Sequence, residues 1–384
     1  MLNFDFYNPT RVIFGDDRIA ELPKRIPHDA RILILYGGDS ARRNGTLDEV
    51  LDALVGHEVF EFGGIEANPS YETLIKAVEL VRAEKVDFLL AVGGGSVIDG
   101  AKFVATAATY DGDPLDILTR RMRIMNALPI GVVLTLAATG SETNNGAVIT
   151  HQATQTKHTL MGERLYPVFA ILDPTKTFTL DARQIGNGVV DAFVHVTEQY
   201  LTYPVNSPVQ DRFAEGLLLT LIDQGPKALA SSRDYDVRAN LMWTASLALN
   251  GLIGSGVPHD WATHMIGHEL TALYGIDHAR TLAVVLPSML KVRKDAKKEK
   301  LVQFAERVWG LTEGEDDQRI RYALARTSKF FESMGVPTKL SAYNLGQDAV
   351  ENVLKHLEAH NMTALGEKRD VTLEISRKVL EGCL

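Results

Sequence analysis

Histidines gather in one stretch of the chain at spacings that suit a metal ion. Asp191 and His195 stand four residues apart, His264 and His268 repeat that spacing, and His278 follows ten residues later. Residues four apart in a helix leave the same face one turn apart, so each pair would present two donors together. One carboxylate and three imidazoles suit divalent iron or zinc, with a position left for a substrate oxygen.

One histidine, or one such pair, is more often a structural or surface feature than a ligand, so the combination carries this prediction. Five of the eleven histidines fall between His195 and His278. Since four donors complete the site, at least one imidazole is left over, and an unligated imidazole near a metal is a natural proton donor.

Two glycine turns could hold a dinucleotide. The run from Gly93 to Ser96 follows an apolar strand and opens a helix, so its bare backbone would suit a pyrophosphate, although glycine also serves tight turns for steric reasons. In the turn from Gly37 to Ser40, Asp39 favours the free ribose hydroxyl of NAD. Ser40 and the following arginines could instead hold the phosphate of NADP, or form only a solvated turn.

The elements that must position these residues follow two different sequence patterns. Short β-rich runs at 31–36, 58–62 and 88–92 alternate with helical windows at 46–55 and 71–85, as in a parallel sheet with crossover helices. Helical periodicity then dominates at 190–201, 211–222 and 238–252. The change of sequence pattern near Leu180 predicts a dinucleotide-binding α/β domain over 1–180 and an all-helical metal-binding catalytic domain over 181–384.

Composition narrows the class of partner. The formal net charge is -9 and the basic residues are scattered, which argues against nucleic acid and membrane surfaces. The chain has one cysteine, Cys383, and its first residues lack the apolar block of a signal peptide. A cytoplasmic enzyme acting on a small molecule is expected.

The same residues occur in the order of a known family. They are Asn68-Pro69, Gly93-Gly94-Gly95-Ser96 with Asp99, Thr135 with Thr139-Gly140-Ser141-Glu142, Asp191 with His195, and His264 with His268 and His278. From about Phe4 to its end the chain resembles the iron-containing alcohol dehydrogenases. Within them it resembles the bacterial branch of NADP-dependent broad-range aldehyde reductases, also called butanol dehydrogenases.

The resemblance implies a Rossmann-like amino-terminal domain and an all-α second domain, the architecture also found in dehydroquinate synthase. The activity implied is hydride transfer between NAD(P)H and small aliphatic aldehydes, or primary alcohols in reverse. NADP(H) is expected, with NAD possible because Asp39 stands where the NADP branch has glycine. One divalent ion, Fe²⁺ or Zn²⁺, and a homodimer paired through the amino-terminal strands are also implied.

Site residues follow from the same resemblance, position by position. The metal ligands would be Asp191, His195, His264 and His278, and His268 would be the catalytic imidazole near the nicotinamide. The cofactor contacts would be Gly38, Ser40, Asn68, Gly95, Ser96, Asp99, Thr135, Thr139, Asn144 and Lys157, to which the glycine turns add Asp39 and Gly94.

Two other functions are compatible with a metal and a dinucleotide. A metal-dependent lyase of the dehydroquinate synthase type would use NAD without consuming it, and a non-enzymatic metal or dinucleotide-binding protein would turn over no carbonyl compound. Stoichiometric consumption of cofactor separates both from the dehydrogenase.

Overall fold

A computed structural model describes residues 1–120 and 122–384 and divides the chain into two compact units. One unit joins Tyr7–Leu180 with Ser232–Ser246, and the other joins Met1–Phe6, Asp181–Ser231 and Leu247–Leu384. No helix in the described part of the chain has the length and apolar composition needed to cross a bilayer.

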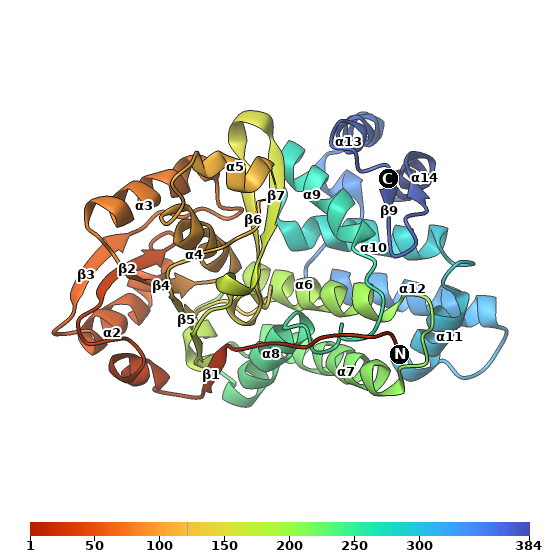
Figure 1. Cartoon of the computed structure of the whole chain (residues 1–384). Coiled ribbons are helices and arrows are strands. Elements are labelled where there is room, and N and C mark those ends of the chain that lie inside the picture. Colours follow the sequence, from red (N-terminus) through yellow and green to blue (C-terminus); the bar gives the residue numbers. More distant parts are fainter. Residues whose placement is uncertain (121) are drawn as a thin grey trace. The chain divides into compact units, whose positions relative to one another are not determined.

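A six-stranded, wholly parallel sheet forms the centre of the first unit (Figure 1). Its order is β1 (Arg11–Phe14), β8 (Phe169–Leu172), β5 (Ile130–Leu134), β4 (Phe88–Gly93), β2 (Arg31–Tyr36) and β3 (Glu58–Phe62). The predicted strands at 31–36, 58–62 and 88–92 are confirmed. β1 and β3 are the edge strands of this sheet.

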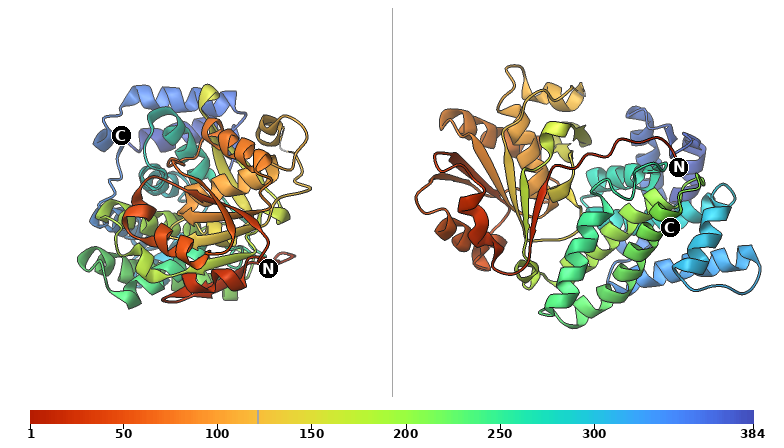
Figure 2. Two further views of the ribbon diagram at one scale, coloured as in Figure 1. Left: turned by 90° about the vertical axis from the view of Figure 1, so that its left-hand side faces the viewer. Right: turned by 60° about the horizontal axis from the view of Figure 1, so that its bottom comes forward.

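Helices cover both faces of the sheet (Figure 2), because alternate residues of its strands point to opposite sides. Leu33 and Leu35 of β2 belong to the apolar core under α3 and α4, whereas Ile32 and Ile34 belong to the core under α2. The helices are α1 (Ser40–Arg43), α2 (Thr46–Ala53), α3 (Tyr71–Ala83), α4 (Gly95–Ala107), α5 (Pro114–Thr119) and most of α8 (Tyr235–Ala248). The predicted parallel sheet with crossover helices is confirmed.

An antiparallel hairpin, not expected from the sequence, joins the same unit. Its strands are β6 (Gly146–His151) and β7 (Thr156–Met161), and Ala147, Ile149 and Leu160 face the core with α4.

The second unit is built from helices. They are α6 (Ala182–Tyr200), α7 (Pro208–Ala230), α9 (Ala262–Tyr274), α10 (His278–Val292), α11 (Lys298–Arg307), α12 (Asp316–Ser333), α13 (Gln347–Ala359) and α14 (Leu373–Glu381). This unit was predicted to be all-helical, but it also contains two antiparallel strands of two residues each, β9 (Ala364–Leu365) and β10 (Val371–Thr372). The helix predicted over 238–252 ends at Ala248, and Gly251 adopts a φ of 92° soon after it.

Candidate metal centre and dinucleotide cradle

Three helices of the second unit bring the predicted metal ligands together. Asp191 and His195 lie on α6, His264 lies on α9, and His278 is the first residue of α10. Candidate donor atoms of Asp191, His195 and His264 lie within 4.8 Å of one another, and all three residues are buried. His278 Nε2 is 3.7 Å from Asp191 Oδ1, which adds the fourth predicted donor to this group.

Local sequence explains why α6 can carry two of these donors. Asp181 caps the helix by accepting a hydrogen bond from the Gln184 backbone N–H at 2.7 Å, while the Gln184 side chain accepts one from the Asp181 N–H. Gly186 lets the helix approach the end of α12, because a Cβ there would meet the Met334 carbonyl oxygen at 2.1 Å.

The imidazoles form a compact set of rings. The His195 and His264 rings stack at 4.8 Å between centroids, and the His278 ring lies 5.2 Å from that of His264. His268 lies on α9 one turn after His264, with its ring 5.0 Å from that of His278. His268 is therefore beside the predicted ligands.

The donor set fits a divalent cation. His195 Nε2 lies 3.9 Å from Asp191 Oδ1, so this ring nitrogen faces the carboxylate with which it would share an ion. Burial lowers the pKa of His195 to about 4, and the neighbouring His264 acts in the same direction, although Asp191 opposes both. His195 is thus neutral near pH 7, the form that binds a metal.

Glu198, which the sequence analysis missed, orients one of these imidazoles. Its Oε2 pairs with His264 Nδ1, and its Oε1 accepts a hydrogen bond from the Thr263 backbone N–H at 2.8 Å. Because Nδ1 is held by Glu198, Nε2 is the His264 nitrogen left to bind a metal ion together with Asp191 and His195. Glu198 stands seven residues after Asp191, on the same face of α6, and that spacing was the available signal.

The Glu198 carboxyl group is deeply buried. Burial raises its pKa well above the ordinary value, and the charge of Asp260 adds to this effect. The backbone N–H groups of Thr263 and His264 and the Lys297 ammonium act in the opposite direction. Lys297 itself lies 2.7 Å from Asp260 and 2.8 Å from Glu367, so a buried network supports the start of α9.

The predicted dinucleotide contacts gather at one edge of the parallel sheet in the other unit. Gly38, Asp39 and Ser40 follow β2, Gly94 and Gly95 follow β4 and start α4, and Thr135 follows β5. Carboxyl ends of parallel strands are where open α/β sheets bind ligands. A Cβ on Gly95 would meet Thr139 Oγ1 at 2.4 Å, so only glycine leaves this backbone uncovered.

Three further predicted contacts are linked by hydrogen bonds. Lys157 Nζ donates to Asn68 Oδ1 at 2.7 Å, and the Asn68 backbone N–H donates to Ser96 Oγ at 3.3 Å. Asn68 has a φ of 57°, a conformation that asparagine tolerates.

The side chains of Asp99 and Asn144 accept hydrogen bonds from other residues of the chain. Asp99 accepts from Ser141 Oγ at 2.6 Å and from the Val148 N–H at 2.9 Å. Asn144 Oδ1 accepts from Lys102 Nζ at 3.0 Å. These two residues shape the loop after β5.

Lys102 is the second residue that the sequence analysis missed. Its side chain is fully buried and donates to the Ser141 carbonyl at 2.7 Å, to Asn144 and to the Gly146 carbonyl at 2.7 Å. Burial lowers the pKa of Lys102 to about 8, against the charges of Asp99 and Glu142. A lysine inside the apolar window 95–107 was the signal.

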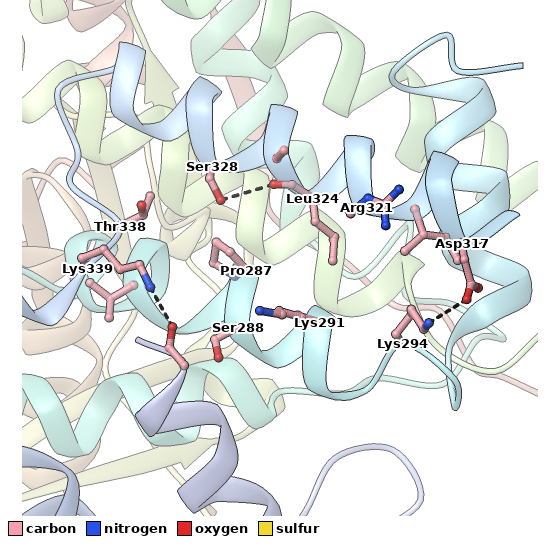
Figure 3. Close-up of a pocket in the computed structure, with 14 residues that line it drawn as sticks. Pro287, Ser288, Lys291, Lys294, Asp317, Arg321, Leu324, Ser328, Thr338 and Lys339 are labelled. Carbon is pink, nitrogen blue, oxygen red and sulfur yellow. Dashed lines mark hydrogen bonds and ion pairs between the residues drawn. The ribbon is translucent and has the colours of Figure 1, made fainter. Parts of the chain in front are cut away.

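A basic groove of the helical unit does not include these site residues. It has a volume of about 580 Å³ and is lined by parts of α10 and α12 and by Gly382 near the end of the chain (Figure 3). Lys294 pairs with Asp317 at 2.9 Å and Lys339 donates to the Gly382 carbonyl at 2.9 Å. None of the predicted metal or cofactor residues is among those that line it.

Comparison with known proteins identifies the family. The model of "Iron-containing alcohol dehydrogenase" matches residues 9–174, and that of "Fe-containing alcohol dehydrogenase family, C-terminal" matches residues 186–373. The chain belongs to the iron-containing alcohol dehydrogenase family. The resemblance drawn from the sequence motifs is confirmed.

Relatives from this family match the chain over nearly its whole length. The chain is 59% identical to the NADPH-dependent aldehyde reductase YqhD of Escherichia coli over 100% of both chains. It is 38% identical to the NADH-dependent butanol dehydrogenase A of Clostridium acetobutylicum over 97% of each. The crystal structure of E. coli YqhD matches with a TM-score of 0.99 at 58% identity, covering 100% of this chain and 99% of that one.

Proposed function

We propose that this protein is a metal-dependent reductase of small aliphatic aldehydes that uses NADPH, and that oxidises primary alcohols in reverse. The observation that carries the proposal is the convergence of one carboxylate and three imidazoles from α6, α9 and α10. The full-length likeness to an NADPH-dependent aldehyde reductase supports the direction of the reaction and the cofactor.

In this proposal the helical unit is the catalytic domain, and Asp191, His195, His264 and His278 hold one divalent cation, Fe²⁺ or Zn²⁺. When bound, the cation supplies polarisation of the substrate carbonyl and the reduced nicotinamide supplies the hydride. Glu198 keeps His264 in position through Nδ1.

His268 supplies the proton that the product alcohol needs. It lies beside the ligand set without being one of the four predicted donors, with its ring 5.0 Å from that of His278. An imidazole titrates near neutral pH, so it can give up a proton and recover it from water in each cycle. Replacing His268 by alanine should therefore lower the rate by roughly 100-fold or more while metal content stays constant.

The α/β unit holds the dinucleotide at the carboxyl ends of β2, β4 and β5. The Gly94–Gly95 turn and the first amides of α4 face the pyrophosphate, and Asn68, Ser96 and Lys157 form a polar group beside them. NADPH is preferred over NADH, since the relative named for NADPH is 59% identical and the one named for NADH is 38% identical.

A homodimer in the cytoplasm completes the proposal. The edge strand β1 and the exposed apolar side chains of Leu2, Phe4 and Tyr7 offer a surface for a second copy. The free, buried thiol of Cys383 is compatible with a reducing compartment.

The deciding experiment measures NADPH oxidation with butyraldehyde, beside NADH, on protein as purified, after chelator dialysis, and after iron or zinc is restored. Stoichiometric oxidation that is lost with the chelator and regained with metal supports the reductase. Asp191→Ala and His264→Ala should abolish turnover and leave NADPH binding intact. Near-normal turnover in both variants, or cofactor bound without consumption, would move the assignment to a lyase or a binding protein.

A further inference from the structure

A second group of metal-binding side chains lies in the helical unit. Glu269 is on α9, His356 is on α13, and His360 is the residue that follows α13. One candidate ligand atom from each lies within 4.8 Å of the other two. None of the three belongs to the Asp191 group, and the proposed reaction does not use them.

A buried apolar interface between α9 and α13 positions this group. Ile266 and Leu270 of α9 share one buried core with Val353 and Leu357 of α13, and both helices are labelled in Figure 1. His356 and His360 are four residues apart, so both imidazoles leave α13 toward the same side, where Glu269 lies.

The Glu269 carboxylate contacts each imidazole through a different oxygen, and its contact with His360 is a hydrogen bond. His360 Nδ1 lies 3.0 Å from Glu269 Oε1, and His356 Nδ1 lies 3.3 Å from Glu269 Oε2. Donors about 2.0–2.1 Å from a tetrahedral zinc ion stand about 3.3 Å from one another. The separations between the carboxylate and the imidazoles thus suit a shared ion.

Two of these donor atoms lack a hydrogen bond. Glu269 Oε2 and His356 Nδ1 are both buried, and neither has a hydrogen-bond partner although they lie 3.3 Å apart. Leaving a buried carboxylate oxygen and a buried ring nitrogen unsatisfied is costly, and an ion bound to both removes that cost.

We propose that Glu269, His356 and His360 form a second divalent cation site, selective for zinc-like ions, that ties α13 to α9. A carboxylate and two imidazoles are donors that zinc accepts, and water takes the fourth position. The His356 and His360 side chains are 28% and 21% exposed, so solvent reaches the site, whereas the Glu269 side chain is 3% exposed and anchors it.

The test measures zinc per chain after equilibrium dialysis of the full-length protein against free zinc. The wild type should hold two equivalents, and His356→Gln with His360→Gln should hold one. Glu269→Gln keeps the volume and hydrogen-bonding capacity of the side chain but removes its charge, and it should also lose one equivalent. Zinc should raise the unfolding temperature of the wild type more than that of either variant.

Matched controls separate this site from the first one. His28 and His57 are also a close pair of rings, at 5.7 Å, but they belong to no three-donor group in the described residues, so replacing both by glutamine should leave two equivalents. Asp191→Ala with His264→Ala should lose the other equivalent and keep this one. Equal zinc content in the wild type and in a folded Glu269→Gln variant would overturn the proposal.

Discussion

At the scale of single residues, the proposed metal centre depends on a side chain that does not itself bind the metal. Glu198 fixes Nδ1 of His264 and the first turn of α9. Without it, the imidazole can rotate, and its remaining nitrogen is a weaker donor. Glu198 therefore has a positioning role, which distinguishes it from Asp191 on the same helix.

We expect Glu198→Gln to weaken metal binding by about 10–100-fold, as loss of an outer-shell carboxylate typically does. At saturating metal, Glu198→Gln should recover a larger fraction of the wild-type rate than a ligand variant such as Asp191→Ala does. Glu215→Gln is the control, because Glu215 is an equally buried carboxylate bound to Tyr200 and Arg307 instead. Equal metal affinity in wild type and Glu198→Gln would remove this role.

Asp39 is the residue that we expect to influence the choice between the two dinucleotides. Its side chain is 83% exposed and makes a long contact of 3.8 Å with Arg43, so little in the protein holds it. A carboxylate at this turn repels a 2′-phosphate and accepts a hydrogen bond from a free ribose hydroxyl. Asp39→Gly should thus raise the ratio of kcat/KM for NADPH to that for NADH, and an unchanged ratio would show that this turn does not contact the ribose.

Cys383 provides a prediction about pH. Its thiol donates to the Val379 and Val284 carbonyls, and burial raises its pKa from 9.0 to about 12. Between these values the unfolded thiol loses its proton and the folded thiol keeps it, so stability falls as pH rises above 9. The loss is about 1.4 kcal/mol per pH unit, and it should be absent from Cys383→Ala.

Two measurements check this prediction. Denaturant unfolding at pH 8 and pH 10 should show a steeper fall in stability for the wild type than for Cys383→Ala. A thiol reagent at pH 8 should label Cys383 only when the protein unfolds. Rapid labelling of the folded chain would contradict the burial of this thiol.

At the scale of elements, glycines decide how closely helices approach. Gly186 of α6 lies against the end of α12, where a Cβ would meet the Met334 carbonyl oxygen at 2.1 Å. Gly216 of α7 is exposed, and a Cβ there would meet nothing within 4 Å. Both positions are helical, so they differ mainly in the space available.

We expect Gly186→Ala to destabilise the protein by about 1–3 kcal/mol, since the backbone oxygen cannot move aside without shifting α12. Gly216→Ala should stabilise it by about 0.5–1 kcal/mol, because alanine has the higher helix propensity and no clash arises. Thermal unfolding of the two variants beside the wild type measures both effects. A neutral Gly186→Ala would mean that α6 and α12 are not held this closely.

The elements also show what the sequence could predict. Short β-rich runs and helical spacing were enough for β2, β3, β4 and α6, because those patterns depend on local burial. The β6–β7 hairpin was missed because β7 has polar residues, Thr156 and His158, on the face that carries the core residue Leu160, which weakens its apolar alternation. Helix ends were displaced where a local φ mattered, as at Gly251 after α8.

Site residues divide in a similar way. The histidines of α6 and α9 were recognisable because both members of each i, i+4 pair lie in one element. Glu198 and Lys102 act through partners 66 and 39 residues away in sequence, so the local signals of helical spacing and of a lysine in an apolar window do not reveal those partners. His356 and His360 carried a visible spacing, but their carboxylate, Glu269, lies on another helix.

At the scale of the whole molecule, the amino-terminal segment exposes large apolar side chains that neither unit covers. Phe4 and Tyr7 are 55% and 57% exposed, and among the described residues β1 is an edge strand that pairs with β8 alone. Exposed aromatic side chains beside an open strand edge are costly in an isolated chain, and a second copy can cover both. The proposed dimer would use this segment from each subunit.

The wild type should therefore sediment at twice the chain mass of 42.2 kDa, and Phe4→Asp with Tyr7→Asp should sediment as a monomer at micromolar concentration. Charged residues in the interface would be buried without partners, which opposes association. Val55→Asp is the control, because Val55 is 82% exposed on the loop after α2 and should leave the dimer intact. A wild-type monomer would contradict the proposed dimer, and a double variant that remains dimeric would place the interface elsewhere.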